Sequence, residues 1–192
     1  MSLNLTDHDQ GLIPMGSTVN TNKVVVPKVT MDRLVMHWSA GNGKVSDLEK
    51  KHYHFIVAAD GTVVPGTNPV ESNIPPLKSG SYAAHTWKLN SNSIGVAVSA
   101  MAGATERPWS PGRHPITKDQ VEALASLVAS LSIMYGIKVT PETVLTHAEV
   151  QPTLGVTQKA KWDITWLPGM DNPQDPRVVG DILRKAIIKE LR

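Results

Sequence analysis

Two histidines stand where short apolar runs of the chain end, and a carboxylate follows them later in the sequence. His37 and His147 each close a run that reads as a buried strand. Asp163 belongs to the stretch Lys161-Trp162-Asp163, which lies in a predicted loop. Two imidazoles and one carboxylate leave the fourth position of a tetrahedral zinc ion open for water, as in a catalytic zinc site. On spacing alone this signal is weak, and polar residues with satisfied hydrogen bonds at strand ends are the more common case.

The composition excludes several kinds of chemical site and several kinds of partner. The chain has 192 residues and no cysteine, which excludes disulfides, cysteine nucleophiles and thiolate metal sites. Hydrophobic residues make up 41% and charged residues 19%, which is a globular composition. The net charge of +2 is too small to indicate nucleic acid as a partner. We see no apolar run of about 18 residues that predicts a membrane span. Because residues 1–10 contain no apolar signal core, we expect the chain to start out in the cytoplasm.

The elements that must position these side chains alternate between strands and helices. Short apolar runs bounded by turn residues predict strands at 33–37, 53–58, 62–64, 94–98 and 144–147. Capping residues and apolar periodicity predict helices at 47–51, 118–135 and 176–191. The remaining stretches 65–92, 101–115 and 148–175 are predicted loops. This pattern predicts a single α/β domain over residues 31–192, with a central mixed β-sheet flanked by helices. Residues 1–30 are predicted to form an N-terminal arm with at most one short strand.

Six short motifs occur in order between residues 33 and 163. They are RLVMHWSAG (33–41), YHFIV with DGTV (53–63), AH (84–85), NSIGV (92–96), THAEV (146–150) and KWD (161–163). In this order and spacing, residues 33–169 resemble the zinc-dependent N-acetylmuramoyl-L-alanine amidases of the type-2 family. That family includes phage lysozyme-like amidases and peptidoglycan recognition proteins. The resemblance implies the family's fold and its peptidoglycan substrate.

The resemblance also assigns roles to individual residues. It implies that His37, His147 and Asp163 bind zinc, and that His85 lies near the substrate. Zinc lowers the pKa of a bound water to about 7 and thereby supplies a hydroxide at neutral pH. Such a site would hydrolyse the amide between N-acetylmuramic acid and L-alanine.

One position departs from the pattern of many family members. They carry an acid/base glutamate where this chain has Ala97. Phage lysozyme-like members also lack that glutamate and use a tyrosine and a lysine, which correspond here to Tyr53 and Lys161. The resemblance therefore makes Tyr53 and Lys161 the expected catalytic residues, with Lys161 stabilising the oxyanion. It leaves the general base open.

Several neighbouring residues have competing interpretations. Trp109 is a candidate glycan contact, because aromatic faces suit sugar rings, whereas the other four tryptophans are assigned to packing. Tyr53 and His54 are adjacent in a predicted strand, so only one faces the metal, and we assign His54 a structural role. Glu149 lies two residues after His147. Two interpretations stay open: Glu149 orients that ligand, or it has no role at the metal.

These expectations combine into a zinc amidase that cleaves peptidoglycan or muropeptides. A lytic role is expected first, as in phage or prophage endolysins, which act on the cell wall after release. The alternatives are a cytoplasmic amidase that recycles muropeptides, a non-catalytic peptidoglycan-binding module and a virion structural protein. The complete set of three candidate ligands argues against the binding module. The oligomeric state is left open.

Overall fold

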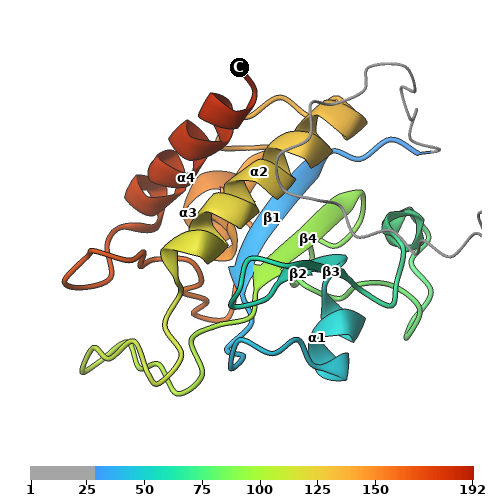
Figure 1. The fold of residues 1–192 in the computed structure, drawn as a ribbon. Coiled ribbons are helices and arrows are strands. Elements are labelled where there is room, and N and C mark those ends of the chain that lie inside the picture. Colours follow the sequence, from blue (N-terminus) through green and yellow to red (C-terminus); the bar gives the residue numbers. More distant parts are fainter. Residues whose placement is uncertain (1–28) are drawn as a thin grey trace, which may run out of the picture.

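A five-stranded mixed sheet forms the centre of this computed structural model, which describes residues 29–192 (Figure 1). Its strands are β1 (Arg33–Trp38), β2 (Phe55–Val57), β3 (Val63–Pro65), β4 (Ser93–Val98) and β5 (Val144–Thr146), in the order β3-β2-β4-β1-β5. All neighbouring pairs are parallel except β2 and β3. The predicted α/β domain with a central mixed sheet is therefore confirmed. The predicted arm, apart from residues 29 and 30, lies outside the described residues.

Four α-helices and one 3-10 turn accompany the sheet in the described part of the chain. They are α1 (Asp47–His52), η1 (Val70–Asn73), α2 (Lys118–Tyr135), α3 (His147–Leu154) and α4 (Pro176–Glu190). Helices α2 and α4 lie side by side across one face of the sheet (Figure 1). Among residues 29–192, no helix combines the length and apolar character needed to cross a bilayer.

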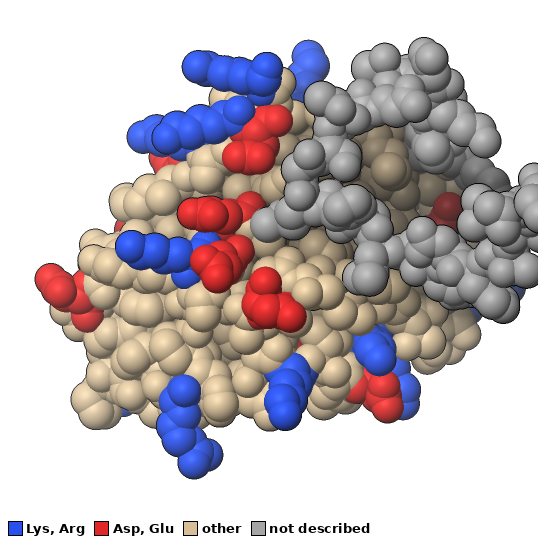
Figure 2. Space-filling view, viewed as in Figure 1, with Lys and Arg blue, Asp and Glu red and all other residues tan. Residues whose placement is uncertain are grey.

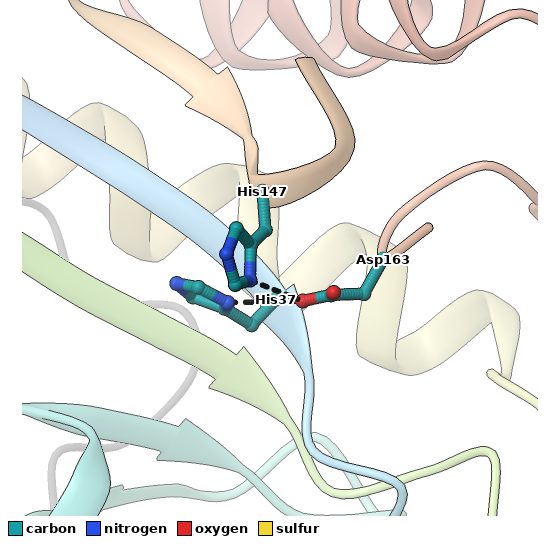
Figure 3. A group of neighbouring side chains, drawn as sticks. All are labelled: His37, His147 and Asp163. Atoms are coloured by element: carbon teal, nitrogen blue, oxygen red, sulfur yellow. Dashed lines mark hydrogen bonds and ion pairs between the residues drawn. The ribbon is translucent and has the colours of Figure 1, made fainter. Parts of the chain in front are cut away.

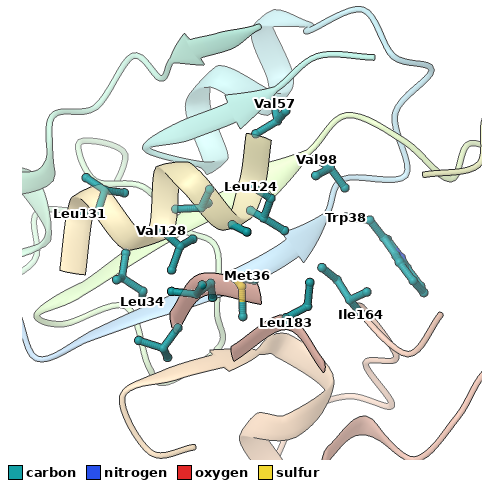
Figure 4. Close-up of a cluster of buried hydrophobic side chains, with 14 of the residues drawn as sticks. Leu34, Met36, Trp38, Val57, Val98, Leu124, Val128, Leu131, Ile164 and Leu183 are labelled. Atoms are coloured by element: carbon teal, nitrogen blue, oxygen red, sulfur yellow. The ribbon is translucent and has the colours of Figure 1, made fainter. Parts of the chain in front are cut away.

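The strand β1 divides its side chains between the core and the site. Leu34, Met36 and Trp38 point into the main apolar cluster, which α2 and α4 complete with residues such as Leu124, Val128 and Leu183 (Figure 4). Because successive side chains of a strand alternate between faces, Val35 and His37 point the other way. Val35 there joins a small cluster with Leu89, Leu145 and Val150. One face of β1 thus holds the fold together, and the other face presents His37.

Helix α2 spans the predicted residues, because both of its ends carry the expected signals. Thr117 and Gln120 form a reciprocal capping box at the start, and Gly136 ends the helix in the left-handed conformation. The buried Gln120 amide also donates to the carbonyl oxygens of Val57 and Ser99, at 3.2 and 3.0 Å. These two bonds attach the helix to the ends of β2 and β4.

Two local predictions near the site are wrong. The predicted loop over 148–175 begins with a helix, α3, whose first residue is His147. Thr146 and Glu149 form its capping box, and Gly155 ends it. Tyr53 does not lie in a strand: it caps the C-terminus of α1, and β2 begins only at Phe55.

Candidate metal centre

Three buried side chains from separate parts of the chain converge near the C-terminal ends of β1 and β5 (Figure 3). His37 lies in β1, His147 opens α3 directly after β5, and Asp163 lies in the loop between α3 and α4. Oδ2 of Asp163 is 3.0 Å from Nδ1 of His37 and 3.2 Å from Nδ1 of His147. One potential ligand atom from each residue lies within 4.8 Å of the others. The structure thus brings together the three ligands predicted from the sequence.

The donor set fits a zinc ion in both spacing and charge. A tetrahedral zinc with ligands at about 2.0 Å keeps its donor atoms about 3.3 Å apart, close to the two contacts of Asp163. Burial lowers the pKa of His37 to about 4, so this ring is neutral at pH 7. Burial alone would raise the pKa of Asp163, but hydrogen bonds to His147 and His37 outweigh it and lower the pKa to about 2. Neutral imidazole and ionised carboxylate are the forms that bind a metal.

The loop that carries Asp163 is held from two sides. The carbonyl oxygen of Asp163 accepts a hydrogen bond from the backbone N–H of Ala148, at 2.6 Å, at the start of α3. The preceding Trp162 packs edge-on against Trp38, with ring centroids 4.7 Å apart. Trp109 lies 6.3 Å from Trp162 in the same aromatic cluster. Backbone and aromatic contacts together place the carboxylate between the two histidines.

Each metal-site histidine has a second partner on its other ring nitrogen. Nε2 of His147 lies 2.9 Å from Oε1 of the buried Gln158. Nε2 of His37 lies 3.4 Å from Oγ1 of Thr86, whose hydroxyl is also 2.8 Å from Nδ1 of His85. The sequence analysis missed Gln158 and Thr86, since neither belongs to a motif and both reach the site only through the tertiary fold.

The structure places His85 beside Thr86, whose hydroxyl also faces His37. It is buried, and its Nε2 faces the carbonyl oxygen of Ser93 at 3.3 Å. Its ring fills the space above Gly95, where an added Cβ would come within 2.4 Å of the ring. Burial lowers the pKa of His85 well below its ordinary value. The glycine of the NSIGV motif therefore makes room for His85, which in turn contacts Thr86.

His54 has the predicted structural role. It is buried, and its Nδ1 accepts a hydrogen bond from the backbone N–H of Gly95 at 2.9 Å. Its Nε2 lies 3.1 Å from Oδ1 of Asn73, whose amide nitrogen donates to two backbone carbonyl oxygens. Burial lowers the pKa of His54 to about 4. A neutral His54 thus joins β4 to η1.

The Glu149 carboxylate forms its hydrogen bonds away from the His147 side chain. It accepts two hydrogen bonds from Arg184 of α4, at 2.8 and 3.2 Å, and one from the N–H of Thr146. Glu149 therefore supports His147 only indirectly, through the backbone of α3. Its role is to cap α3 and to fasten that helix to α4.

The two expected catalytic residues differ in burial. The half-buried Tyr53 ring has its centroid 5.1 Å from that of His37. Lys161 is exposed, and its charge contributes in a minor way to the lowered pKa of His37. Ala97 pairs with His37 in the register of β1 and β4 and is fully buried. The position of the family's glutamate is therefore beside the metal ligand, but here it offers only a methyl group.

The surface beside the centre has a hollow and an exposed aromatic ring. A cavity of about 420 Å³ is lined by residues that include Ala148, Gln158 and Lys161. The prediction that Trp87 serves only for packing is wrong, because it is 55% exposed, with the Lys159 ammonium 4.9 Å from its ring centroid. Trp109 is half-buried against the aromatic cluster.

Comparisons with known proteins identify the family. A sequence profile described as N-acetylmuramoyl-L-alanine amidase matches residues 27–169. No curated protein sequence matches the chain. Among solved structures, the chain is similar to N-acetylmuramoyl-L-alanine amidase LysC from Clostridium intestinale URNW, with 18% identity over 65% of this chain and 74% of that chain and a TM-score of 0.43. It is also similar to the Ph2119 endolysin from Thermus scotoductus MAT2119 bacteriophage Ph2119, with 18% identity over 73% and 88% of the two chains and a TM-score of 0.40.

A further similar structure is the Staphylococcus aureus hydrolase AmiA, with 15% identity over 84% of this chain and 73% of that chain and a TM-score of 0.49. Similarities this low carry no argument about activity. The family profile, in contrast, covers most of the chain and includes all three converging side chains. This chain belongs to the N-acetylmuramoyl-L-alanine amidase family.

Proposed function

We propose that this protein is a zinc-dependent hydrolase of the amide bond between N-acetylmuramic acid and L-alanine in peptidoglycan. The observation that carries the proposal is the buried group His37, His147 and Asp163, which offers two imidazoles and a carboxylate to one ion. It occurs in a chain of the amidase family, and Tyr53 lies directly beside it. When bound, the zinc supplies an activated water and polarises the scissile carbonyl.

Lys161 and Tyr53 are assigned the other chemical roles at the site. The Lys161 ammonium sits at the exposed side of the site and is suited to donate a hydrogen bond to the developing oxyanion. Burial raises the pKa of Tyr53, so its phenol keeps the proton at neutral pH. Tyr53 therefore acts as a hydrogen-bond donor to the reacting oxygen. With Ala97 in place of a glutamate, no carboxylate from β4 shares in proton transfer.

Substrate recognition is proposed for the surface around the metal centre. Both ring nitrogens of His85 are engaged within the protein, which favours a supporting role beneath Thr86 over direct contact with substrate. Trp109 stays a proposed glycan contact through its exposed part. Trp87 is the more exposed ring and follows Thr86 directly, so we add it as a second stacking surface for a sugar.

The test is digestion of purified peptidoglycan followed by analysis of the new end groups. Amidase activity releases L-alanine amino termini, whereas a glycosidase would release reducing sugars. A His147→Ala variant serves as the inactive control. Intact walls that show neither product with the zinc-loaded protein would overturn the proposal.

We propose a lytic, endolysin-like role over muropeptide recycling. The support is Ala97, which matches the phage lysozyme-like variant of the family pattern. The two roles predict opposite substrate preferences. A lytic enzyme cleaves cross-linked peptidoglycan efficiently, whereas a recycling enzyme prefers small soluble muropeptides, so a comparison of kcat/KM on both substrates distinguishes them.

A further inference from the structure

Gln158 is a buried amide that connects a candidate metal ligand to a neighbouring loop. It lies after α3 and is 6% exposed. Its Nε2 donates to the carbonyl oxygens of Trp87 and Val156, at 2.9 and 3.3 Å. Its Oε1 lies 2.9 Å from Nε2 of His147. Its own backbone N–H donates to Oε1 of Gln151, at 2.9 Å. All of its polar side-chain atoms are thus engaged within the protein.

The partners of Gln158 determine which way its amide points. Backbone carbonyl oxygens only accept hydrogen bonds, so the amide nitrogen has to face Trp87 and Val156. In the reversed orientation, Oε1 would face two other oxygen acceptors and repel them. The side-chain oxygen therefore faces His147.

This orientation in turn determines the proton position on His147. An amide oxygen only accepts, so Nε2 of His147 has to carry the proton of this contact. Oδ2 of Asp163 also only accepts, so in the metal-free protein it competes for the ring proton at Nδ1, and the 2.9 Å contact at Nε2 is the shorter of the two. In a neutral imidazole, a proton on Nε2 leaves Nδ1 with a free lone pair. Nδ1 is the atom that lies 3.2 Å from Oδ2 of Asp163, on the side where the ligand atoms converge.

We propose that Gln158 is a positioning residue for His147, which keeps the proton on Nε2 and turns Nδ1 toward the metal. The inference rests on the metal centre of the proposed function and adds a residue to it. Gln158 does not bind the ion; it acts through the ligand. Partners of this kind contribute about 10- to 100-fold to metal affinity.

The other histidine has no equally strict partner. Nε2 of His37 faces the Thr86 hydroxyl at the longer distance of 3.4 Å. A hydroxyl donates as well as accepts, so Thr86 alone does not determine which nitrogen of His37 is protonated. Gln158 is therefore the clearest determinant of ligand geometry in the described residues around the site.

Three variants separate positioning of His147 from anchoring of the loop. Gln158→Met keeps the approximate volume but removes both functions of the amide. Gln158→Glu keeps an acceptor for His147 and loses the donor to Trp87 and Val156. Gln174→Met removes an exposed glutamine amide whose hydrogen bond goes to the Asn172 carbonyl oxygen and not to the metal centre. Thermal unfolding of each chelator-treated variant shows whether the fold is retained.

The first measurement is the dissociation constant for Zn²⁺, from competition with a chromogenic chelator. We expect Gln158→Met to bind zinc about 10- to 100-fold more weakly than the wild type. Gln174→Met should stay close to the wild type. Gln158→Glu should lose less affinity than Gln158→Met, because it keeps the acceptor for His147 although its second oxygen faces the carbonyl oxygens of Trp87 and Val156. Wild-type affinity in Gln158→Met would overturn the inference. Equal losses in the Met and Glu variants would assign Gln158 to loop anchoring and overturn it as well.

The second measurement needs neither zinc nor activity. In chelator-treated, ¹⁵N-histidine-labelled wild-type protein, His147 should show a slowly exchanging proton on Nε2. That proton should persist in Gln158→Glu and Gln174→Met and be lost in Gln158→Met. A neutral wild-type His147 with its proton on Nδ1 would overturn the inference. If the wild type takes up no zinc, the proposed function fails. The proton assignment in the wild type still tests the role of Gln158 in that case. It does so even if Gln158→Met does not fold.

Discussion

Tyr53 is half-buried beside His37 and Lys161 is exposed, and each is expected to act on the transition state. Removing one such hydrogen-bond donor typically costs about 100- to 1000-fold in turnover. We expect Lys161→Ala and Tyr53→Phe to lower kcat by this order while zinc content stays unchanged. Steady-state kinetics with elemental analysis measure both quantities. The loss should appear in kcat more than in KM.

Matched controls for this prediction lie elsewhere in the chain. Lys138→Ala removes an exposed lysine beyond the C-terminus of α2, and Tyr82→Phe removes a phenol with no contact to His37. Both variants should turn over as the wild type does. Near-normal turnover in both Lys161→Ala and Tyr53→Phe, with zinc bound, would show that other groups carry the proton transfer.

The three candidate ligands lead to a separate prediction. His37→Ala, His147→Ala and Asp163→Ala should each abolish hydrolysis and reduce the zinc content below about one ion per chain. The circular dichroism of α2 and α4 should persist, because the main apolar cluster does not contain these side chains. His52→Ala, which removes an exposed histidine, is the control. A variant that keeps wild-type turnover would remove its residue from the ligand set.

Sequence reasoning identified the three ligand candidates because each carries a local signal or a family motif. Gln158 and Thr86 carry none, since a glutamine and a threonine in loops are ordinary surface residues until the fold buries them. The exposure of the Trp87 and Trp109 rings could not be predicted from the sequence either. Nothing in their local sequence distinguishes the exposed ring from the one packed against Trp162.

At the scale of elements, a buried ion pair joins α3 to α4. Glu149 is fully buried and Arg184 nearly so, and their side chains form two hydrogen bonds. Burial raises the pKa of Glu149, and Arg184 counteracts that shift. Gly180 leaves the space for the carboxylate, because a Cβ there would lie 2.0 Å from it. This contact determines where the first turn of α3, and with it His147, sits against α4.

Breaking that pair should destabilise the protein strongly. Removing one partner leaves an uncompensated buried charge, so we expect Arg184→Met to lower the free energy of unfolding by about 3–5 kcal/mol. Urea denaturation measures the change. Asp181→Asn is the control: Asp181 bonds the same guanidinium at 2.7 Å, but its side chain is 60% exposed, and the expected cost is at most about 1 kcal/mol. Equal costs for both variants would contradict a special role for Glu149.

The elements themselves differed in how far the sequence could predict them. Helix α2 was predicted with its correct bounds because an apolar stripe runs between two strong caps. Helix α3 was missed because it has eight residues, no apolar stripe and an internal proline, Pro152, although Thr146 and Glu149 offered a capping box. Tyr53 was misplaced because aromatic and β-branched residues follow it without a break, while its backbone still closes α1.

At the scale of the whole molecule, the charged side chains on one face mix both signs. On the face shown in Figure 2, acidic and basic side chains are interspersed over the described residues. In the interior, by contrast, the titratable side chains His37, His54, His85 and Asp163 are all buried. We therefore expect buried side chains to determine how the free energy of unfolding changes in acid.

That response has a definite sign. The pKa of His54 is lowered to about 4 by burial, whereas an unfolded histidine titrates near 6.5. Between these values the unfolded chain binds a proton that the folded protein excludes. The free energy of unfolding therefore falls as the pH drops from about 6.5 toward 4, and the contribution of His54 levels off below that. The full difference for His54 is on the order of 3 kcal/mol.

We therefore expect the chelator-treated protein to lose stability steadily across this pH range. His54→Asn should flatten the dependence by about one proton, because asparagine offers an acceptor to the Gly95 N–H but does not titrate. Urea denaturation at several pH values gives the slope, and the variant's lower stability at pH 7 does not affect it. His37 and His85, whose pKa values burial also lowers, keep part of the slope in the variant. An unchanged slope in His54→Asn would mean that burial does not lower the pKa of His54 below its value in the unfolded chain, and it would contradict this assignment.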